Sequence, residues 1–305
     1  MKKIISVLLC VCLLFPCAVS AVAEGVRYDT PYENSSFFDY GEYTLHYRVF
    51  PAEGENKGQI MMLHGFAEST YCWQNLAALL TANGYTCVAV DLPDFGFSSR
   101  ETKDTVRLPR EEVVHALMSR LSDEPWYLAG HSMGGYVALA VAQTYPDSVK
   151  NLLLYGTSGN DGNAASAAMG NDFFASVVGP FMELMGRCKP LVWLLLRVAI
   201  QDSEFVRAYD VDAIVAPFRI KGTGTGAVYN FSMLTPTDYE TVSQMPPILF
   251  MNGDKDKVIA DSARKNLRAA LPENSLDYIV EGGGHMFIEN KAEETARVTL
   301  DFLSR

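Results

Sequence analysis

From about residue 37 onward, short runs of β-prone residues alternate with stretches of helical periodicity. The predicted strands lie at 43–50, 58–65, 85–93, 126–130, 149–156, 246–253 and 276–283. The predicted helices that separate the earlier strands lie at 72–84, 110–121 and 134–145, and the last two strands are each followed by a helical pattern. Strands that alternate with helices form parallel sheets whose crossovers cover both faces. The chain is therefore expected to be an α/β protein with a mostly parallel, doubly wound sheet.

Residues 160–240 interrupt this alternation. They contain an apolar helical run at 181–200 and a glycine-rich stretch at 221–230, and they predict an inserted helical cap between two parts of the core, 24–159 and 241–305. The "GTGTG" motif within the cap follows no strand, lacks the spacing of a dinucleotide-binding fingerprint and precedes no Walker lysine. It is expected to be a loop. The stretch "NAASAAMG" at 163–170 belongs to the same insertion.

The N-terminal segment has the pattern of a secretory signal peptide. Lys2 and Lys3 precede an apolar run at 4–15, and an A-x-A cleavage site follows at 21–23. The apolar run is shorter than the ~20 residues that a membrane-spanning helix needs. Residues 1–23 are therefore expected to be removed from a secreted or extracytoplasmic protein, and an uncleaved N-terminal membrane anchor is the alternative.

Charge and cysteine content exclude several classes of partner. Removal of residues 1–23 takes away two lysines and no acids, so the formal net charge falls from -11 to -13, and nucleic acid is not expected to bind. Cys72, Cys87 and Cys188 remain, an odd and widely spaced set that predicts buried or partly buried thiols rather than a disulfide framework. The mature chain has no metal-ligand spacing such as H-x-x-x-H, H-x-H or C-x-x-C. No metal and no cofactor are expected.

Ser132 lies between glycines in "GHSMGG", directly after the predicted strand at 126–130. A strand that enters a helix through a very tight turn needs small neighbours around the apex, and such a turn presents the apical side chain to a substrate. A serine hydroxyl is a weak nucleophile that needs a nearby base, itself oriented by a third group. The glycines therefore make Ser132 a candidate nucleophile.

The base and the acid can be sought among the few histidines and the loop acids. His285 follows three glycines on the loop after the last predicted strand, at the sheet edge where such folds place their chemistry, and it is the candidate base. His46, His64, His115 and His131 are assigned no such role. The acid should also follow a strand, and Asp161, Asp254 and Asp256 are the open candidates.

Five motifs in this order resemble the α/β-hydrolase superfamily over essentially the whole mature chain: "LHGF", "VDLPDFGFSS", "GHSMGG", "NGDKDKVI" and "GGGHMFIEN". The resemblance implies an α/β-hydrolase-type sheet with an inserted cap. It also implies Ser132 as nucleophile, Asp256 as acid and His285 as base, with the backbone N–H groups of Phe66 and Met133 as oxyanion hole.

Asp94 stands where this superfamily usually has glycine. The loop is therefore expected either to bend differently or to present a carboxylate near the cap.

The resemblance implies a serine hydrolase, and a carboxylic ester hydrolase for small to medium apolar acyl groups is the favoured reading. A C–C bond hydrolase of ring-fission diketones and a small peptidase are the alternatives, and a non-catalytic binding protein is disfavoured because none of the three implied positions is altered. For the C–C hydrolase, the carboxylate of the diketone could be bound by one of the basic residues of the cap, Arg187, Lys189 or Arg197. The cap is apolar around most of its helical run, so the face toward Ser132 should be apolar and peripheral contact with lipid is allowed. The oligomeric state does not follow from the sequence.

Overall fold

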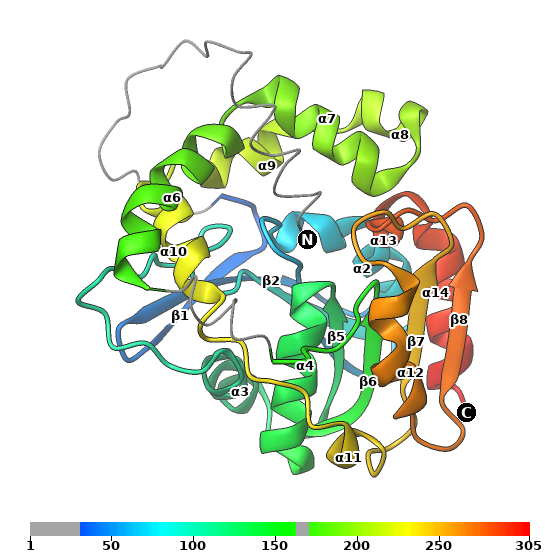
Figure 1. Cartoon of the computed structure of the whole chain (residues 1–305). Helices are drawn as coiled ribbons and strands as arrows, with labels where there is room; N and C mark the ends of the chain where they lie inside the picture. The colour runs from blue at the N-terminus through cyan, green and yellow to red at the C-terminus, as the bar shows by residue number, and fades with distance from the viewer. Residues whose placement is uncertain (1–30, 163–170) are drawn as a thin grey trace.

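In the computed structural model, which describes residues 31–162 and 171–305, an eight-stranded sheet forms the centre of the molecule (Figure 1). The strand order is β1-β2-β4-β3-β5-β6-β7-β8. The strands are β1 (Ser35–Tyr40), β2 (Tyr43–Phe50), β3 (Gly58–Leu63), β4 (Tyr85–Val90), β5 (Trp126–His131), β6 (Val149–Tyr155), β7 (Leu249–Gly253) and β8 (Leu276–Val280). The signal peptide predicted at 1–23 and the stretch 163–170 lie outside the described residues.

The sheet is parallel from β4 to β8 and antiparallel at its other end, where β2 pairs with both β1 and β4. This confirms the expected mostly parallel α/β fold. The sequence pattern did not predict β1. It is joined to β2 by a tight turn in which Gly41 has a φ of 57°, a conformation that glycine adopts without steric cost.

Helices cover both faces of the sheet. The first face carries α3 (Arg110–Leu121), α4 (Met133–Thr144) and α12 (Lys265–Ala269), and the second carries α2 (Gln74–Thr81), α13 (Phe287–Asn290) and α14 (Ala292–Leu303). Because successive strand residues point to opposite faces, neighbours in β3 belong to different clusters. Met61 and Leu63 pack under α3 and α4, whereas Ile60 and Met62 pack under α2 and α14.

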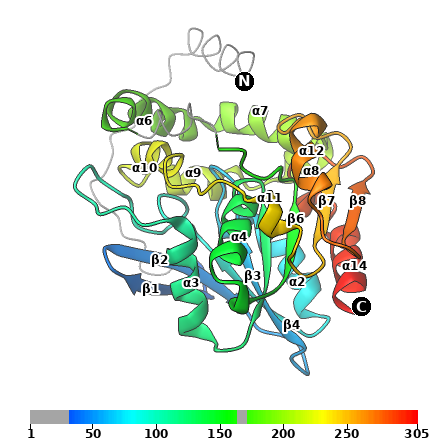
Figure 2. The same cartoon turned by 60° about the horizontal axis from the view of Figure 1, so that its bottom comes forward.

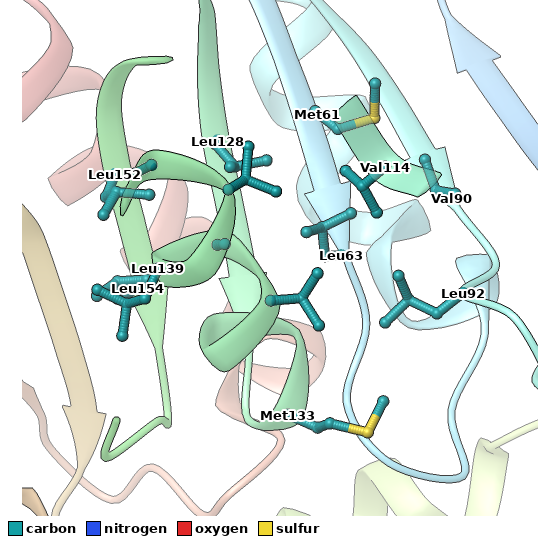
Figure 3. Packing of buried hydrophobic residues seen from close by; sticks show 14 of the residues in the cluster. Met61, Leu63, Val90, Leu92, Val114, Leu128, Met133, Leu139, Leu152 and Leu154 are labelled. Carbon is teal, nitrogen blue, oxygen red and sulfur yellow. The ribbon is translucent and has the colours of Figure 1, made fainter. Parts of the chain in front are cut away.

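Figure 3 shows side chains of the first of these clusters, which include Leu139 of α4, Leu154 of β6 and Met133 at the start of α4. The labelled side chains are buried, with exposures of 4% or less. A core of this kind fixes the strand ends and the start of α4 relative to one another. The loops at these strand ends are therefore held on a rigid support.

Five cap helices lie between β6 and β7 among the described residues: α6 (Asp172–Gly186), α7 (Lys189–Ile200), α8 (Ser203–Ala208), α9 (Val211–Phe218) and α10 (Thr223–Asn230). Figure 1 shows them at the sheet end toward which β7 and β8 point. The short helix α11 (Tyr239–Val242) then returns the chain to the core beside α4. Across the described ranges, no helix has the length and apolar character needed to cross a bilayer.

The prediction that "GTGTG" forms a loop is wrong, because these residues begin helix α10. Glycine and threonine are weak helix formers, but tertiary packing overrides this weak preference. A Cβ at Gly224 would lie 1.9 Å from the carbonyl oxygen of Gly179 in α6, and a Cβ at Gly226 would lie 2.0 Å from the carboxylate of Asp94. The glycines therefore allow α10 to approach both α6 and the core more closely than any other residue would.

Candidate active site

Ser132 forms the apex of the turn between β5 and α4. Its φ of 51° and ψ of -117° are unusual for a residue other than glycine, and they mark a strained backbone. Position 134, two residues after Ser132, admits only glycine, since a Cβ at Gly134 would lie 2.1 Å from the carbonyl oxygen of Leu63. The Ser132 N–H donates to the Tyr155 carbonyl (2.9 Å), and the Thr157 hydroxyl donates to the Ser132 carbonyl (2.8 Å). Ser132 is partly exposed and lies between two buried neighbours, as the turn predicts.

His285 lies on the glycine-rich loop after β8, and its Nδ1–H donates to Oδ2 of Asp256 over 2.8 Å. A Cβ at Gly284 would lie 2.4 Å from the carbonyl oxygen of Ala199, so this loop passes directly against the end of α7. The Met286 N–H donates to the same carbonyl (3.1 Å). The cap therefore contacts the loop that carries the candidate base.

Asp256 follows β7 and accepts hydrogen bonds on both carboxylate oxygens. Oδ1 accepts from the Val258 and Ile259 N–H groups at 2.8 and 3.0 Å, whereas Oδ2 accepts from His285 and from the buried guanidinium of Arg264. Burial alone would raise the pKa of Asp256, but the hydrogen bond and charge of His285, with the backbone N–H and Arg264, lower it to about 2. Asp256 is therefore an anion that fixes the Nδ1–H tautomer of His285.

The pKa of His285 is lowered from its ordinary value, chiefly by burial, with the hydrogen bond to Asp256 opposing this effect. At neutral pH the ring is therefore neutral, and Nε2 can accept a proton. A base needs this state to remove a proton from a hydroxyl group.

The structure does not bring the other two acids that the sequence left open to His285. Asp161 is exposed and accepts from the hydroxyl of Tyr239 and from Asn266. Asp254 is exposed on the turn after β7. Asp256 is thus the acid that meets the histidine.

His131, which sequence reasoning assigned no role, lies directly behind His285. Its Nδ1–H donates to Oε2 of Glu68 (2.9 Å) and its Nε2–H donates to the carbonyl oxygen of His285 (3.0 Å). Both acceptors can only accept, so both ring nitrogens carry hydrogen and His131 is an imidazolium. Burial alone would lower the pKa of His131, but Glu68 raises it above its ordinary value. His131 therefore fixes the backbone of His285, the candidate base.

Glu68 also connects this pair to the loop after β3. Its carboxylate accepts from the Gly65 N–H (2.8 Å), one residue before Phe66. Burial would raise the pKa of Glu68, but the charge and hydrogen bond of His131 lower it to about 2. A glutamate three residues after "HG" and a histidine directly before the serine were the available signals, but their pairing requires the folded structure.

Phe66 and Met133, whose N–H groups were predicted to form the oxyanion hole, lie at the ends of the adjacent strands β3 and β5. Outside regular helices and strands, no backbone hydrogen bond within the described residues uses either N–H group. The loop of Phe66 is fixed by His64, whose Nδ1–H donates to the Gly65 carbonyl (2.7 Å) and whose Nε2 accepts from the Leu92 N–H (3.0 Å). The role of these two N–H groups as an oxyanion hole stays a prediction.

Of the two outcomes that the sequence left open for Asp94, the structure shows the second, a carboxylate near the cap. It has a φ of 76°, and its carboxylate is buried against Gly226 of α10. Arg110 donates to Oδ2 (3.0 Å) and the Glu101 N–H donates to Oδ1 (2.7 Å). Burial raises the pKa of Asp94 to about 7, with Arg110 opposing this effect. The loop therefore bends as a glycine would and also places a carboxylate beneath the cap.

Arg100, in the same loop, joins the core to the cap and was not predicted from sequence. Its Nε donates to the hydroxyl of Thr223 in α10 (2.8 Å), and its terminal nitrogens donate to backbone carbonyls that include Gly96 (2.6 Å) and Pro217 (3.4 Å). These bonds seat α9 and α10 over the sheet edge.

The remaining histidines and the thiols have structural surroundings. His46 is buried and donates to Asp91 (2.7 Å), and His115 stacks on Tyr145 with ring centroids 3.7 Å apart. Cys72 and Cys87 are buried and Cys188 is partly buried, as expected.

Comparison with known proteins gives consistent similarities. The family model described as "alpha/beta hydrolase fold" matches residues 59–292. An uncharacterised hydrolase, YugF, of Bacillus subtilis is 24% identical over 84% of this chain and 94% of its own length. The human monoacylglycerol lipase ABHD6 is 25% identical over 82% of this chain and 76% of its own length. The solved enol-lactonase of Burkholderia xenovorans LB400 has a TM-score of 0.67 and 17% identity, and the match covers 88% of this chain and 100% of the other.

The family model spans most of the chain, and it runs from β3 to the start of α14. It therefore includes Ser132, Asp256 and His285, and also Phe66 and Met133. The sheet order, the strained serine turn and the histidine–aspartate pair agree with this match. The chain belongs to the α/β-hydrolase fold family.

Proposed function

We propose that this chain is a serine hydrolase that cleaves carboxylic esters of small to medium apolar acyl groups through an acyl-enzyme. The observation that carries the proposal is the 2.8 Å hydrogen bond between His285 and Asp256. It lies at the sheet edge where Ser132 has its strained conformation. The contact of His131, the immediate neighbour of Ser132, with the His285 carbonyl supports the closeness of the serine and the histidine.

In the proposed mechanism, Nε2 of His285 takes the hydroxyl proton of Ser132 while the serine oxygen bonds to the ester carbonyl carbon. Asp256 stabilises the imidazolium that forms, and the N–H groups of Phe66 and Met133 donate to the oxyanion. His285 then gives the proton to the leaving alcohol. Water, deprotonated by the same histidine, releases the acid and restores the serine.

An apolar acyl group is favoured by the surface between core and cap. A small pocket there, whose lining includes neither Ser132 nor His285, has apolar residues on both sides, Ile214, Pro217 and Phe218 from the cap and Ala67 and Phe95 from the core, beside the polar residues Glu68, Ser69 and Thr223. Each methylene moved from water into such surroundings contributes about 0.8 kcal/mol. The similarity to a monoacylglycerol lipase, an enzyme named for an ester substrate, supports the same class of bond.

The C–C hydrolase alternative needs a cation for the carboxylate of its substrate, and the surroundings of the three cap candidates weigh against it. Arg187 donates to Glu183 and to the Phe218 carbonyl, and Lys189 bonds to Asp212. Arg197 is exposed and lies over the ring of Trp193. The ester hydrolase is therefore preferred.

The test is a series of p-nitrophenyl esters measured beside a vinylogous diketone. We expect kcat/KM to rise from acetate to butyrate or hexanoate, by about fourfold per methylene at most, and then to fall as the cap limits length. Phe218→Ala should flatten the rise, and Val106→Ala, at an exposed site, should not. A diketone cleaved far faster than every ester would contradict the proposal.

We also propose that the protein is exported after removal of residues 1–23. The mature N-terminus should then be Glu24, or Val22 if cleavage follows Ala21. N-terminal sequencing of the protein recovered outside the cytoplasm measures this. Intact Met1 on membrane-held protein would favour the uncleaved anchor instead.

A further inference from the structure

Large apolar side chains with high exposure are concentrated on the outer cap. Among the described residues, eight of the twelve such side chains belong to α6 and α7. These eight, here called the outer cap face, are Phe173, Phe174, Val177, Phe181, Leu184, Leu194, Leu195 and Val198. Single exposed apolar residues are ordinary, but a contiguous group of this size marks an interaction surface.

Helix α6 buries one side and exposes the opposite one. Ala175 and Gly179 are buried, and Gly179 packs against α10. Phe173, Val177 and Phe181 repeat every four residues on the other side, with Phe173 75% and Val177 61% exposed. At 3.6 residues per turn these three form one apolar stripe directed away from α10.

Helix α7 has the same arrangement. Val192, Leu196 and Ile200 are buried in the interior of the cap, whereas Leu194 and Leu195 are 48% and 50% exposed. Figure 2 shows α6 and α7 in the outermost layer of the cap, with α9 and α10 between them and the sheet. The apolar sides of both helices therefore lie on the outer surface of the cap.

The charge of this segment differs from that of the rest of the chain. Residues 172–200, which cover α6 and α7, contain two acids, Asp172 and Glu183, and three basic residues, Arg187, Lys189 and Arg197, a net charge of +1, whereas the whole chain has a net charge of -11. The Arg197 guanidinium lies 4.9 Å from the ring centroid of Trp193. Apolar and aromatic side chains flanked by basic ones are the pattern of helices that lie in the interface of an anionic membrane.

We propose that the outer cap face docks the protein on a lipid surface that contains anionic headgroups. The apolar side chains enter the boundary between headgroups and acyl chains, and the exposed Arg197 meets the phosphates, since Arg187 and Lys189 are paired with Glu183 and Asp212. This docking does not depend on the proposed hydrolysis. It would also place the cap, and the core–cap boundary below it, beside an apolar phase.

A second copy of the chain is a less suitable occupant. A symmetric dimer would bring the same patch against itself and place two net-positive segments in contact. A membrane with anionic headgroups supplies both the apolar medium and the opposite charge. Lipid is therefore the occupant that the residues favour.

The experiment is flotation with vesicles, using the Ser132→Ala variant so that lipid hydrolysis cannot alter the result. Vesicles of phosphatidylcholine are compared with vesicles of equal parts phosphatidylcholine and phosphatidylglycerol. All proteins carry the same N-terminus, so any binding by residues 1–23 is common to them. We expect binding to the anionic vesicles that added salt weakens.

Phe173→Ser combined with Val177→Ser should lower partitioning onto these vesicles by about tenfold or more. Ile279→Ser, at a site on β8 that is 48% exposed, is the matched control and should leave partitioning unchanged. Both variants should unfold at the temperature of the parent, because the altered side chains face solvent. A further variant, Leu195→Ser, tests α7 separately and should also weaken binding.

Unchanged partitioning of the folded α6 and α7 variants would overturn the proposal. Equal binding to both vesicle types would overturn the part played by anionic headgroups. Concentration-dependent self-association that the α6 variant abolishes, without vesicle binding by the parent, would assign the surface to a second copy. Ester hydrolysis is measured separately with the unaltered protein, which retains Ser132. Failure of the docking proposal can therefore be distinguished from failure of the proposed function.

Discussion

At the carboxyl edge of the sheet, polar side chains are buried and have partners, whereas on the outer cap apolar side chains face solvent. Asp256 accepts four hydrogen bonds, and His131 donates from both ring nitrogens. On α6, by contrast, Phe173 is three-quarters exposed. Each region departs from the usual distribution of side chains, but in opposite directions.

The difference separates two kinds of function. Buried polar groups cost stability unless they are paired, so a chain that keeps them gains fixed geometry and shifted pKa values. Exposed apolar groups cost solubility and are useful where a partner covers them. The sheet edge is thus suited to chemistry, and the outer cap is suited to docking. Substitutions can therefore alter one region and leave the other unchanged.

The largest effect is expected from Asp256→Asn. The amide cannot hold the Nδ1–H tautomer of His285 as the carboxylate does, and kcat should fall by about 10⁴-fold. Asp254→Asn and Asp161→Asn should lose little, since neither reaches His285. Steady-state kinetics with one ester measures all three. A severe loss in Asp161→Asn with an active Asp256→Asn would move the acid to the end of β6.

A smaller effect is expected from Glu68→Gln, which removes the counter-charge of the buried His131. Loss of the His131 contact to the His285 carbonyl should lower kcat by about tenfold to 100-fold with KM nearly unchanged, because small misplacements of a base are costly. Removal of one partner of a buried pair should also lower the free energy of unfolding by about 3 kcal/mol.

Glu53→Gln, at an exposed site, is the control for Glu68 and should change neither quantity. A Glu68→Gln protein that is destabilised but retains its full kcat would make the Glu68–His131 pair purely structural. A rise in KM without a change in kcat would instead place the pair in substrate binding.

The smallest effect is a displacement of the pH profile. Burial lowers the pKa of His285 below its ordinary 6.5, and the base must be unprotonated to act, so the acid limb of kcat/KM should have its midpoint below 6.5. Activity is lost as pH falls through that midpoint. Asp256→Asn removes an interaction that raises this pKa, so its residual activity should have a lower midpoint still. A midpoint above 6.5 in the parent would be inconsistent with a buried neutral histidine.

Much of the core followed from sequence because its signals are local. Strands β2 to β8 fall within or close to the predicted runs, since residues such as Ile60 and Met61 are apolar on both sides of a buried strand. Ser132 and His285 could be located in the sequence because glycines lie near each of them. The steric effect of a glycine is also local. Edge strand β1, half-buried and partly polar, lacked such a signal.

The features that sequence could not supply depend on contacts between distant segments. Helix α10 exists because Gly224 meets Gly179, and no pattern within "GTGTG" contains that information. Glu68 and His131 are 63 residues apart, and their pairing arises only when β3 and β5 become neighbours. The apolar run at 181–200 indicated helices but not which sides face outward.

Ser132 is proposed to be a nucleophile that the His285–Asp256 pair activates. The most direct measurement is labelling with a fluorophosphonate followed by peptide mapping, in the parent, in Ser132→Ala and in Ser119→Ala, an exposed control serine. We expect one adduct per chain, on Ser132, in the parent and in the control. We expect no adduct in Ser132→Ala, although that protein unfolds at nearly the same temperature. An adduct that persists in Ser132→Ala, or a folded parent that takes no label, would contradict the proposed role of Ser132.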